Sequence, residues 1–528
     1  MFSFFKTLTE TLWGDFGYCV FFFVSLAILF AMATDVLKRT AFMWYSAICF
    51  VFIYNPLMLM VARKLLYEDM FLSYYLKLFN VVPVVIIIGY GLTTLIATQS
   101  GVKKLVLTFA LMGVMVICGR TVYRELWFEK ADNFAKVPDE VFELQEVMEP
   151  QLAEAKENDD KVGIMVPLDL SVYLRQIEPG FKQQYSRYDW QKTSDYLLCE
   201  EPDVDYVYET ALGYDMDYVL VKSQDKTLKP YLKNDRFNEL GTISNSEYTL
   251  MSIDHPEWIM WQCADESYDQ GICYILHNTI NGSVIVIDGG TAKNGASIHA
   301  DLKALGGHVD AWIITHYHQD HVGAFNWIMN NCDDITVDTV YDTPLDRDYF
   351  LEKAYEWDDV DYFLDYENIR ENTTYVKAFL SVNRGDELTL CKDVEIKFFN
   401  AYDEKAREAG FDDIGNNCAL VFKLSVGEDS ILFMSDCHTE NMAKLMMDEF
   451  GDEMSAKYLQ VAHHGNNSVP TDIGFYELID AEVALFDAPE WLMTGEAYTA
   501  KDLKKYLEKN GTEIRWFDRW RHAWAMGE

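Results

Sequence analysis

One short polar run narrows the possible folds of this chain more than any other feature. Three imidazoles and a carboxylate fall within six residues, directly after the strand-like segment 311–315: His316, His318, Asp320 and His321. Such groups are costly to desolvate at the end of a buried strand unless a cation satisfies them. Imidazole and carboxylate ligands together suit zinc, with iron and manganese as alternatives. The run therefore predicts a site for one or two divalent metal ions at the end of a strand.

Two later strand-like segments end in groups that suit the same site. The segment 430–435 leads into Asp436, and the segment 458–462 leads into His463 and His464. A carboxylate has two oxygens and can bridge a pair of ions roughly 3.5–4 Å apart. We therefore expect the ends of three strands to meet around the metal.

An earlier strand supplies a supporting motif. The apolar segment 284–287 ends in Asp288, Gly289 and Gly290. Glycines allow the backbone to approach closely, and the carboxylate can orient neighbouring ligands. Short strands alternate with helical patterns from about residue 251 onward, so residues 251–528 are predicted to form a layered α/β domain.

These motifs resemble the metallo-β-lactamase superfamily in their order and approximate spacing, over residues 270–490. Within the superfamily, segment 416–421 and the His-His-Gly motif at 463–465 most resemble the ComEC-like branch, the domain attached to membrane proteins of DNA uptake. The resemblance implies an αββα sandwich with the site at one edge of its paired sheets. It also implies hydrolysis by a metal-activated water.

The resemblance implies a role for each residue. The implied metal ligands are His316 and His318 for one ion, Asp320 and His321 for a second ion, Asp436 as the bridge between them, and His464 to complete the second ion, with His463 as the alternative assignment. Asp320 and Asp436 are the candidate catalytic residues, and Asp320 would also steer the nucleophile. Asp288, Gly289 and Gly290 would give structural support.

The chain departs from the superfamily in one respect. Many members supply another histidine to the first ion between these motifs, but residues 322–435 contain no histidine. The ComEC-like branch has asparagine and small polar residues there, so Asn416 and Asn417 are the candidates to replace it, directly or through water. The first ion would then be held more weakly, which makes a single ion, or manganese, credible.

The N-terminal part has a different character. Four long apolar stretches, at 16–33, 41–62, 78–97 and 105–122, are each close to the ~20 residues that a helix needs to cross a bilayer. They predict a domain of about four transmembrane helices over residues 1–123, embedded in the lipid bilayer. Basic residues in the short first and third connectors place the C-terminal domain outside the cell. The stretches contain few charges, so an anchor is favoured over a transport channel.

The rest of the chain is strongly acidic. The whole chain has a formal net charge of -40, from 84 acidic and 44 basic residues, and residues 1–123 contribute +4, so the rest carries -44. Because nucleic-acid binding needs clustered Lys and Arg, the charge disfavours nucleic acid as a partner without excluding a local basic cleft. Residues 124–250 read as an acidic α/β connecting region without a catalytic signature. The ten cysteines contain no CxxC pair, so neither a disulfide framework nor a zinc knuckle is predicted.

The sequence thus predicts a multi-domain chain: a transmembrane domain (1–123), a connecting region (124–250) and a metallo-β-lactamase-like sandwich (251–528). The predicted function is a membrane-anchored metal-dependent hydrolase, with nuclease-like or envelope phosphodiesters favoured by analogy with the ComEC-like branch. Other esters, including lactones and thioesters, stay open as substrates. The alternative is a non-catalytic membrane sensor or binding protein that keeps a degenerate metal site. Protein partners cannot be predicted.

Overall fold

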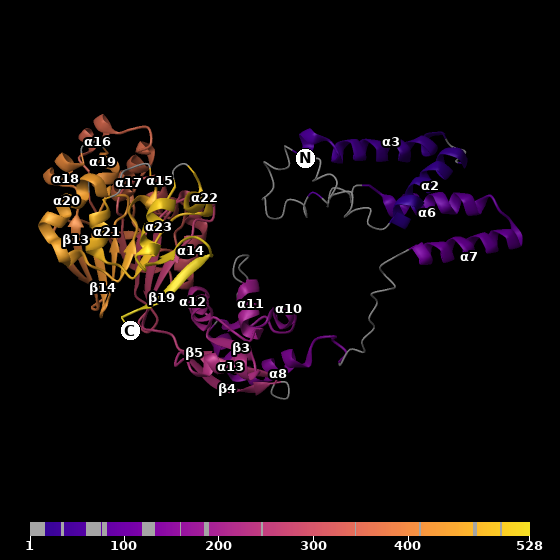
Figure 1. Cartoon of the computed structure of the whole chain (residues 1–528), viewed down its shortest axis with the longest axis horizontal. Helices are drawn as coiled ribbons and strands as arrows, with labels where there is room; N and C mark the ends of the chain where they lie inside the picture. The colour runs from indigo at the N-terminus through magenta and orange to yellow at the C-terminus, as the bar shows by residue number, and fades with distance from the viewer. Residues whose placement is uncertain are drawn as a thin grey trace. The chain divides into compact units, whose positions relative to one another are not determined.

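The chain divides into two compact units, Met1–Lys130 and Ala131–Glu528. The computed structural model describes residues 16–32, 36–59, 75, 82–118, 133–158, 160–183, 190–243, 247–343, 345–410, 413–467, 472–496 and 499–527. Each unit is described by itself (Figure 1).

The described residues of the first unit are mainly helical. Its helices are α2 (Phe16–Met32), α3 (Val36–Ile53), α6 (Val84–Ala97) and α7 (Gly101–Cys118). Helices α2 and α6 approach closely because Gly91 has no side chain. A Cβ atom added at Gly91 would lie 2.5 Å from the Cβ atom of Ser25. The hydroxyl of Ser25 also donates a hydrogen bond of 3.4 Å to the carbonyl of Ile88.

The helices of this unit contradict the prediction of a transmembrane domain. Within the part of the chain that the structure describes, no helix has both the length and the apolar character needed to cross a bilayer. The longest, α3 and α7, have 18 residues each, about 27 Å at 1.5 Å per residue, against roughly 30 Å of hydrocarbon. Prolines shorten two of the expected stretches: α3 ends before Pro56, and α6 begins only after Pro83.

The prediction of a four-helix membrane domain was therefore wrong. The predicted integral-membrane localisation, with an extracellular C-terminal domain, depended on that domain and was wrong as well. Parts of the expected spans, at residues 33, 60–62, 78–81 and 119–122, lie outside the described residues.

The second unit begins with a five-stranded sheet in the order β2-β1-β3-β5-β4. Its strands are β1 (Val162–Met165), β2 (Phe181–Lys182), β3 (Tyr218–Lys222), β4 (Phe237–Ile243) and β5 (Tyr248–Ile253). Its helices are α8 (Asp139–Val147), α9 (Glu149–Glu157), α10 (Leu168–Ile177), α11 (Trp190–Leu198), α12 (Val204–Tyr214) and α13 (Asp225–Leu232).

The remainder of this unit contains two seven-stranded sheets. The first, in the order β11-β10-β9-β8-β7-β6-β19, consists of β6 (Trp258–Cys263), β7 (Cys273–Asn278), β8 (Val284–Asp288), β9 (His308–Ile313), β10 (Thr336–Asp342), β11 (Val376–Ser381) and β19 (Arg521–Met526). The second, in the order β12 to β18, consists of β12 (Glu387–Leu390), β13 (Val394–Asn400), β14 (Val421–Val426), β15 (Asp429–Phe433), β16 (Tyr458–Gln460), β17 (Val483–Leu485) and β18 (Glu513–Arg515).

Helices complete the layers of this part. They are η3 (Ala292–Asn294), α14 (Gly295–Ala304), α15 (Gln319–Asn331), α16 (Arg347–Lys353), α17 (Val360–Asn372), α18 (Glu404–Ala409), α19 (Ile414–Asn417), α20 (Thr439–Phe450), η4 (Gly451–Met454), η5 (Ala462–Gly465), α21 (Ile473–Ile479), α22 (Glu490–Thr494) and α23 (Lys501–Lys509).

Alternation along the strands explains the layers. On β9, Ile313 faces a core shared by both sheets, which also contains Phe422 and Phe433 of the second sheet. Its neighbour Trp312 faces the opposite side, where it packs with Phe325 of α15. The second sheet is covered in the same way by α20 and α21. Side chains of a strand point alternately to its two faces, so helix, sheet, sheet and helix follow in order, and the predicted αββα sandwich is present.

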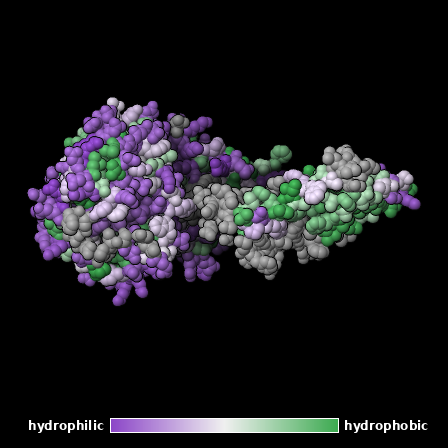
Figure 2. All heavy atoms as spheres, turned by 90° about the horizontal axis from the view of Figure 1, so that it is seen from above, coloured by the Kyte–Doolittle hydropathy of each residue, from purple (hydrophilic) through white to green (hydrophobic). Residues whose placement is uncertain are grey.

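The visible face of this second unit is mostly hydrophilic, with only small apolar patches (Figure 2). The five-stranded domain packs against the sandwich through α12 and β19. Arg521 of β19 donates a 3.0 Å hydrogen bond to the carbonyl of Gly213, and the indole N–H of Trp261 in β6 donates a 3.1 Å hydrogen bond to the carbonyl of Leu212. These contacts attach the connecting domain to the sandwich.

Candidate metal centre

The predicted site residues follow strands that end at one edge of the sandwich. Strands β8 and β9 are parallel in the first sheet, and β15 and β16 are parallel in the second. Asp288 is the last residue of β8, and His316, Asp436 and His463 each come three residues after the end of β9, β15 and β16. Because parallel strands present their carboxyl ends at the same edge, residues far apart in sequence come together there.

The backbone at these strand ends is unusual. Asp288, Ser435, His463 and His464 all have positive φ angles, between 49° and 56°. A residue other than glycine in this conformation costs of order 1–3 kcal/mol, and such strain gathers at functional sites. The turns direct the following side chains into the site.

Two groups of buried side chains can each hold a metal ion. One group contains His316, His318 and Asp436; the other contains Asp320, His321, Asp436 and His464. Within each group the ligand atoms lie within 4.8 Å of one another. Asp436 belongs to both groups, which is the arrangement expected of a carboxylate that bridges two ions.

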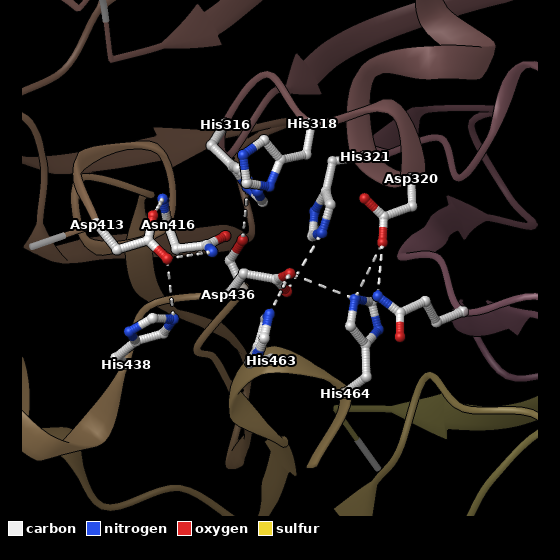
Figure 3. Close-up of polar contacts among 12 residues, drawn as sticks. His316, His318, Asp320, His321, Asp413, Asn416, Asp436, His438, His463 and His464 are labelled. Carbon is white, nitrogen blue, oxygen red and sulfur yellow. Dashed lines mark hydrogen bonds and ion pairs between the residues drawn. The ribbon is translucent and has the colours of Figure 1, made fainter. Parts of the chain in front are cut away.

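The contacts around Asp436 show how tightly the groups converge (Figure 3). Its Oδ1 lies 3.2 Å from His321 Nε2, and its Oδ2 lies 3.3 Å from His464 Nε2. His464 Nε2 is also 3.3 Å from Asp320 Oδ2. His463 is farther away, with its Nε2 3.8 Å from Asp436 Oδ2. Of the two histidines, His464 therefore fits the second group, and His463 lies beside it.

The buried carboxylates and imidazoles of the site shift one another's pKa values. Burial raises the pKa of Asp436, but His464 and His321 outweigh it and hold that pKa well below its usual value. Burial lowers the pKa of His464, but Asp436 and Asp320 reverse this and raise it to about 10. Burial, together with His321 and His318, lowers the pKa of His316 well below its usual value. The carboxylates thus stay ionised and need cationic partners.

The donor atoms fit a divalent metal. The Nε2 atoms of His316, His321 and His464 and the Oδ1 atom of Asp436 are buried without a hydrogen-bond partner. Buried polar atoms are rarely left unsatisfied, and each one is costly. Imidazole nitrogens and carboxylate oxygens directed at a common point are the ligands that zinc and related ions prefer. The residues present therefore match the metal that the sequence predicts.

Supporting residues orient the ligands. His321 Nδ1 lies 2.8 Å from Asp288 Oδ2, and His464 Nδ1 lies 2.9 Å from the carbonyl of Asp487. With the proton on Nδ1, each imidazole presents its Nε2 lone pair to the site. Asp288 also accepts hydrogen bonds from the backbone and hydroxyl of Thr315, at 2.8 and 2.6 Å. These contacts put Asp288 in a position to orient His321, and that role stays a prediction.

The two glycines after Asp288 allow close packing. A Cβ atom added at Gly290, whose φ is +71°, would lie 2.6 Å from Asn294 Nδ2. One added at Gly289 would lie 3.2 Å from the Cβ atom of Ala324 in α15. The carbonyl of Gly290 also accepts a 3.1 Å hydrogen bond from the backbone N–H of Ala324. This contact fixes the helix that follows the histidine-rich run.

The structure separates the two asparagines proposed to replace the missing histidine. Asn416 lines the cavity above the site, and its Oδ1 has no hydrogen-bond partner. Asn417 Oδ1 instead accepts a 3.2 Å hydrogen bond from the backbone N–H of His438, and its Nδ2 donates to the carbonyl of Gly410. Asn416 is therefore placed to meet an ion or a substrate, and Asn417 holds the surrounding loops together.

Sequence reasoning missed Asp358. This buried carboxylate lies 3.0 Å from His318 Nε2, which leaves Nδ1 as the free ring nitrogen of His318 for a metal. Asp358 is 40 residues from His318 and lies in a chain rich in Asp, so its sequence gave no signal. Asp413, which was also missed, pairs on the cavity wall with His438, whose Nε2 lies 3.6 Å from Asp413 Oδ2 (Figure 3).

Gly415 should be required for this arrangement. A Cβ atom there would lie 2.2 Å from Asp358 Oδ1 and 2.9 Å from His318 Nε2. We expect Gly415→Ala to displace the two side chains and weaken binding of one ion about 10- to 100-fold, the range seen when residues that support metal ligands are altered. Zinc titration calorimetry on the full chain measures this. Gly241→Ala, where a Cβ atom would meet nothing within 4 Å, is the control; equal affinities in the two variants would contradict the assignment.

One family model matches part of the chain. Residues 268–361 match the family model described as "Metallo-beta-lactamase superfamily". No curated protein matches the chain in sequence. Similar solved structures include the metallo-beta-lactamase fold protein YhfI from Bacillus subtilis, with 13% identity over 50% of this chain and 99% of that chain, at a TM-score of 0.31.

Two further solved structures match this chain with similar identity and coverage. Igni18, a metallo hydrolase from the archaeon Ignicoccus hospitalis, shares 14% identity over 51% of this chain and 99% of its own, at a TM-score of 0.31. A putative metal-dependent hydrolase from Parabacteroides distasonis shares 12% sequence identity with this chain. The match covers 53% of this chain and 97% of that one, at a TM-score of 0.28. The family match covers the segment with His316, His318, Asp320 and His321, so the chain contains a metallo-β-lactamase superfamily domain.

Proposed function

We propose that this chain is a metal-dependent hydrolase that cleaves a phosphodiester with water. The observation that carries the proposal is the position of Asp436, which is shared by two groups of metal-ligating side chains. A cavity of about 580 Å³ reaches this point, and its lining includes His318, Asp320, Asp436 and His463. A site of this kind has both a place for the ions and room for a substrate.

The proposed ligands are His316, His318 and Asp436 for one ion and Asp320, His321, Asp436 and His464 for the other. When bound, divalent ions supply Lewis acidity toward the phosphoryl oxygens and lower the pKa of a coordinated water toward neutrality. Zinc fits the second group best because it offers two imidazoles and two carboxylates. The first group has fewer ligands, so manganese or iron can compete there, with Asn416 Oδ1 as an additional oxygen donor.

The protein groups have separate tasks in this reaction. Asp320 lines the cavity, and His464 and His321 outweigh its burial and lower its pKa. It therefore stays ionised and can orient the attacking water by accepting its hydrogen bond. Gln270 Nε2 lies 3.1 Å from Asp320 Oδ2 and holds the carboxylate in place. Asp288 and Asp358 keep the imidazoles in the required orientation.

The preference for a phosphodiester rests on the resemblance to the ComEC-like branch, whose motifs 416–421 and 463–465 this chain shares. Long nucleic acids are the less favoured form of that substrate. The chain has a net charge of -40, and Lys293 is the single Lys or Arg among the described residues that line the cavity. A small phosphodiester needs no extended basic surface.

Hydrolysis of bis(p-nitrophenyl) phosphate by the full chain tests this proposal. We expect turnover with zinc or manganese, loss of turnover after treatment with a chelator, and loss in His318→Ala. His308→Ala is the matched control, because His308 lies on β9 in a different, partly exposed group with Asp310 and Asp338. Bound metal without turnover of any ester would contradict the hydrolase and favour the non-catalytic alternative.

A further inference from the structure

The cavity above the metal centre has an exposed aromatic wall. Trp357 lines the cavity although 57% of its surface is exposed. Its ring stacks on Tyr355, with a centroid distance of 4.5 Å and an interplanar angle of 12°. Tyr355 thus covers one face of the indole, while the side chain as a whole stays largely exposed and lines the cavity.

This aromatic pair is tied to the metal centre. The backbone N–H of Tyr355 donates a 2.5 Å hydrogen bond to Asp358 Oδ2, and Asp358 Oδ1 contacts His318 Nε2. The loop that carries Trp357 is therefore held in a fixed position relative to the ligands. A substrate group that stacks on the indole would be placed at a defined distance from the reacting centre.

The surroundings of Trp357 are strongly acidic. Asp269, Asp359 and Asp413 line the cavity in addition to the proposed ligands. A second hollow of about 320 Å³ shares Ala292 and Tyr362 with the first and is lined by Asp361 and Asp365. None of the described residues around this second hollow is Lys or Arg. Clefts lined by charges of one sign concentrate ligands of the opposite sign.

A buried acceptor in the same cavity also lacks a partner. Asn416 is 3% exposed, its Nδ2 donates to Asp413 Oδ2, and its Oδ1 has no donor. A buried acceptor without a donor is costly. A metal ion of the first group, as proposed above, or an N–H group would satisfy it, whereas an anion would not.

From the aromatic wall and the carboxylates, we infer that the substrate carries an organic ammonium group, which binds over Trp357 in the cavity that Asp359 also lines. This deepens the proposed function and rests on it: the scissile phosphodiester lies at the metal centre, and Lys293 is the single Lys or Arg among the described residues that line the cavity. Aromatic faces attract ammonium groups through the ring quadrupole. Nearby carboxylates add to that attraction.

Calorimetric titration of the full chain with choline tests the inference. The neutral control ligand is 3,3-dimethylbutanol, which has the same shape without the charge. We expect choline to bind measurably more tightly than the alcohol, and Trp357→Leu and Asp359→Asn each to weaken choline binding about fivefold, as expected for a partly exposed cation–π contact. Asn tolerates the left-handed φ of 48° found at Asp359. Glu356→Gln, an exposed charge change in the same loop that does not line the cavity, is the control.

Equal binding of choline and the alcohol, or choline binding that is insensitive to Trp357→Leu and Asp359→Asn, would overturn the inference. Binding is measured without turnover, so its outcome is independent of hydrolysis. Tight choline binding without any hydrolysis would contradict the proposed function but support the cation site. Hydrolysis of bis(p-nitrophenyl) phosphate, which has no ammonium group, without choline binding would overturn the cation site and leave the proposed function intact.

Discussion

Asp436→Asn is expected to reduce kcat/KM for phosphodiester hydrolysis at least about 10³-fold, which corresponds to about 4 kcal/mol of transition-state stabilisation. Asp436 is buried, stays ionised and belongs to both groups of metal-ligating atoms. Asparagine keeps the size of the side chain but loses the charge and one of the two oxygens. Both ions should therefore be held more weakly, and metal content and turnover should fall together.

Asp429→Asn is the matched control for this variant. Asp429 is a buried aspartate at the start of the same strand, β15, where it pairs with Lys457 at 2.6 Å. Its replacement should affect stability but leave the number of bound ions unchanged. Steady-state kinetics and elemental analysis of the full chain give both quantities. An Asp436→Asn protein that keeps two ions and near-normal turnover would remove the basis of the proposed function.

Asp288→Ala is expected to have the second-largest effect, on folding and metal affinity alike. Asp288 is fully buried and accepts hydrogen bonds from the backbone and hydroxyl of Thr315 and from His321. Removing it leaves these donors unpaired, at a cost of about 3–5 kcal/mol in the free energy of unfolding. His321 would also lose the partner that fixes its orientation, so metal affinity should fall about 10- to 100-fold.

Thermal unfolding and metal titration check this expectation. Asp288→Asn keeps one acceptor oxygen, so its unfolding temperature and metal affinity should fall less than those of Asp288→Ala. Asp393→Ala, at an exposed position between β12 and β13, should unfold at the wild-type temperature. If Asp288→Ala unfolded at the same temperature as Asp393→Ala and bound metal with wild-type affinity, Asp288 would have no orienting role.

The strands, and the side chains that gather at their ends, could be predicted because their signals are local. The apolar segment before His316 is short, buried and followed at once by the ligands, so one stretch of sequence specifies both the strand and the site. The segments before Asp436 and His464 have the same form. The periodicity of two and the chemistry of the strand ends together indicate the fold and its active edge.

The remaining features depend on contacts between distant residues. Asp358 contacts His318 across 40 residues of sequence, and Gly415 of α19 leaves room for the two side chains. Nothing in the local sequence distinguishes Asp358 from the other aspartates. The stack of Tyr355 and Trp357 is likewise set by a hydrogen bond to Asp358. In the first unit, apolar composition alone overestimated helix length, because the prolines at 56 and 83 fall inside two of the expected spans.

The central claim is that two ions share Asp436. Crystals of the full chain grown with zinc, with anomalous diffraction recorded on both sides of the zinc absorption edge, test it most directly. We predict two anomalous peaks roughly 3.5–4 Å apart, one beside His316 and His318, the other beside Asp320, His321 and His464, with Asp436 between them. Peaks elsewhere, or a fully loaded site in which Asp436 contacts neither ion, would contradict the account.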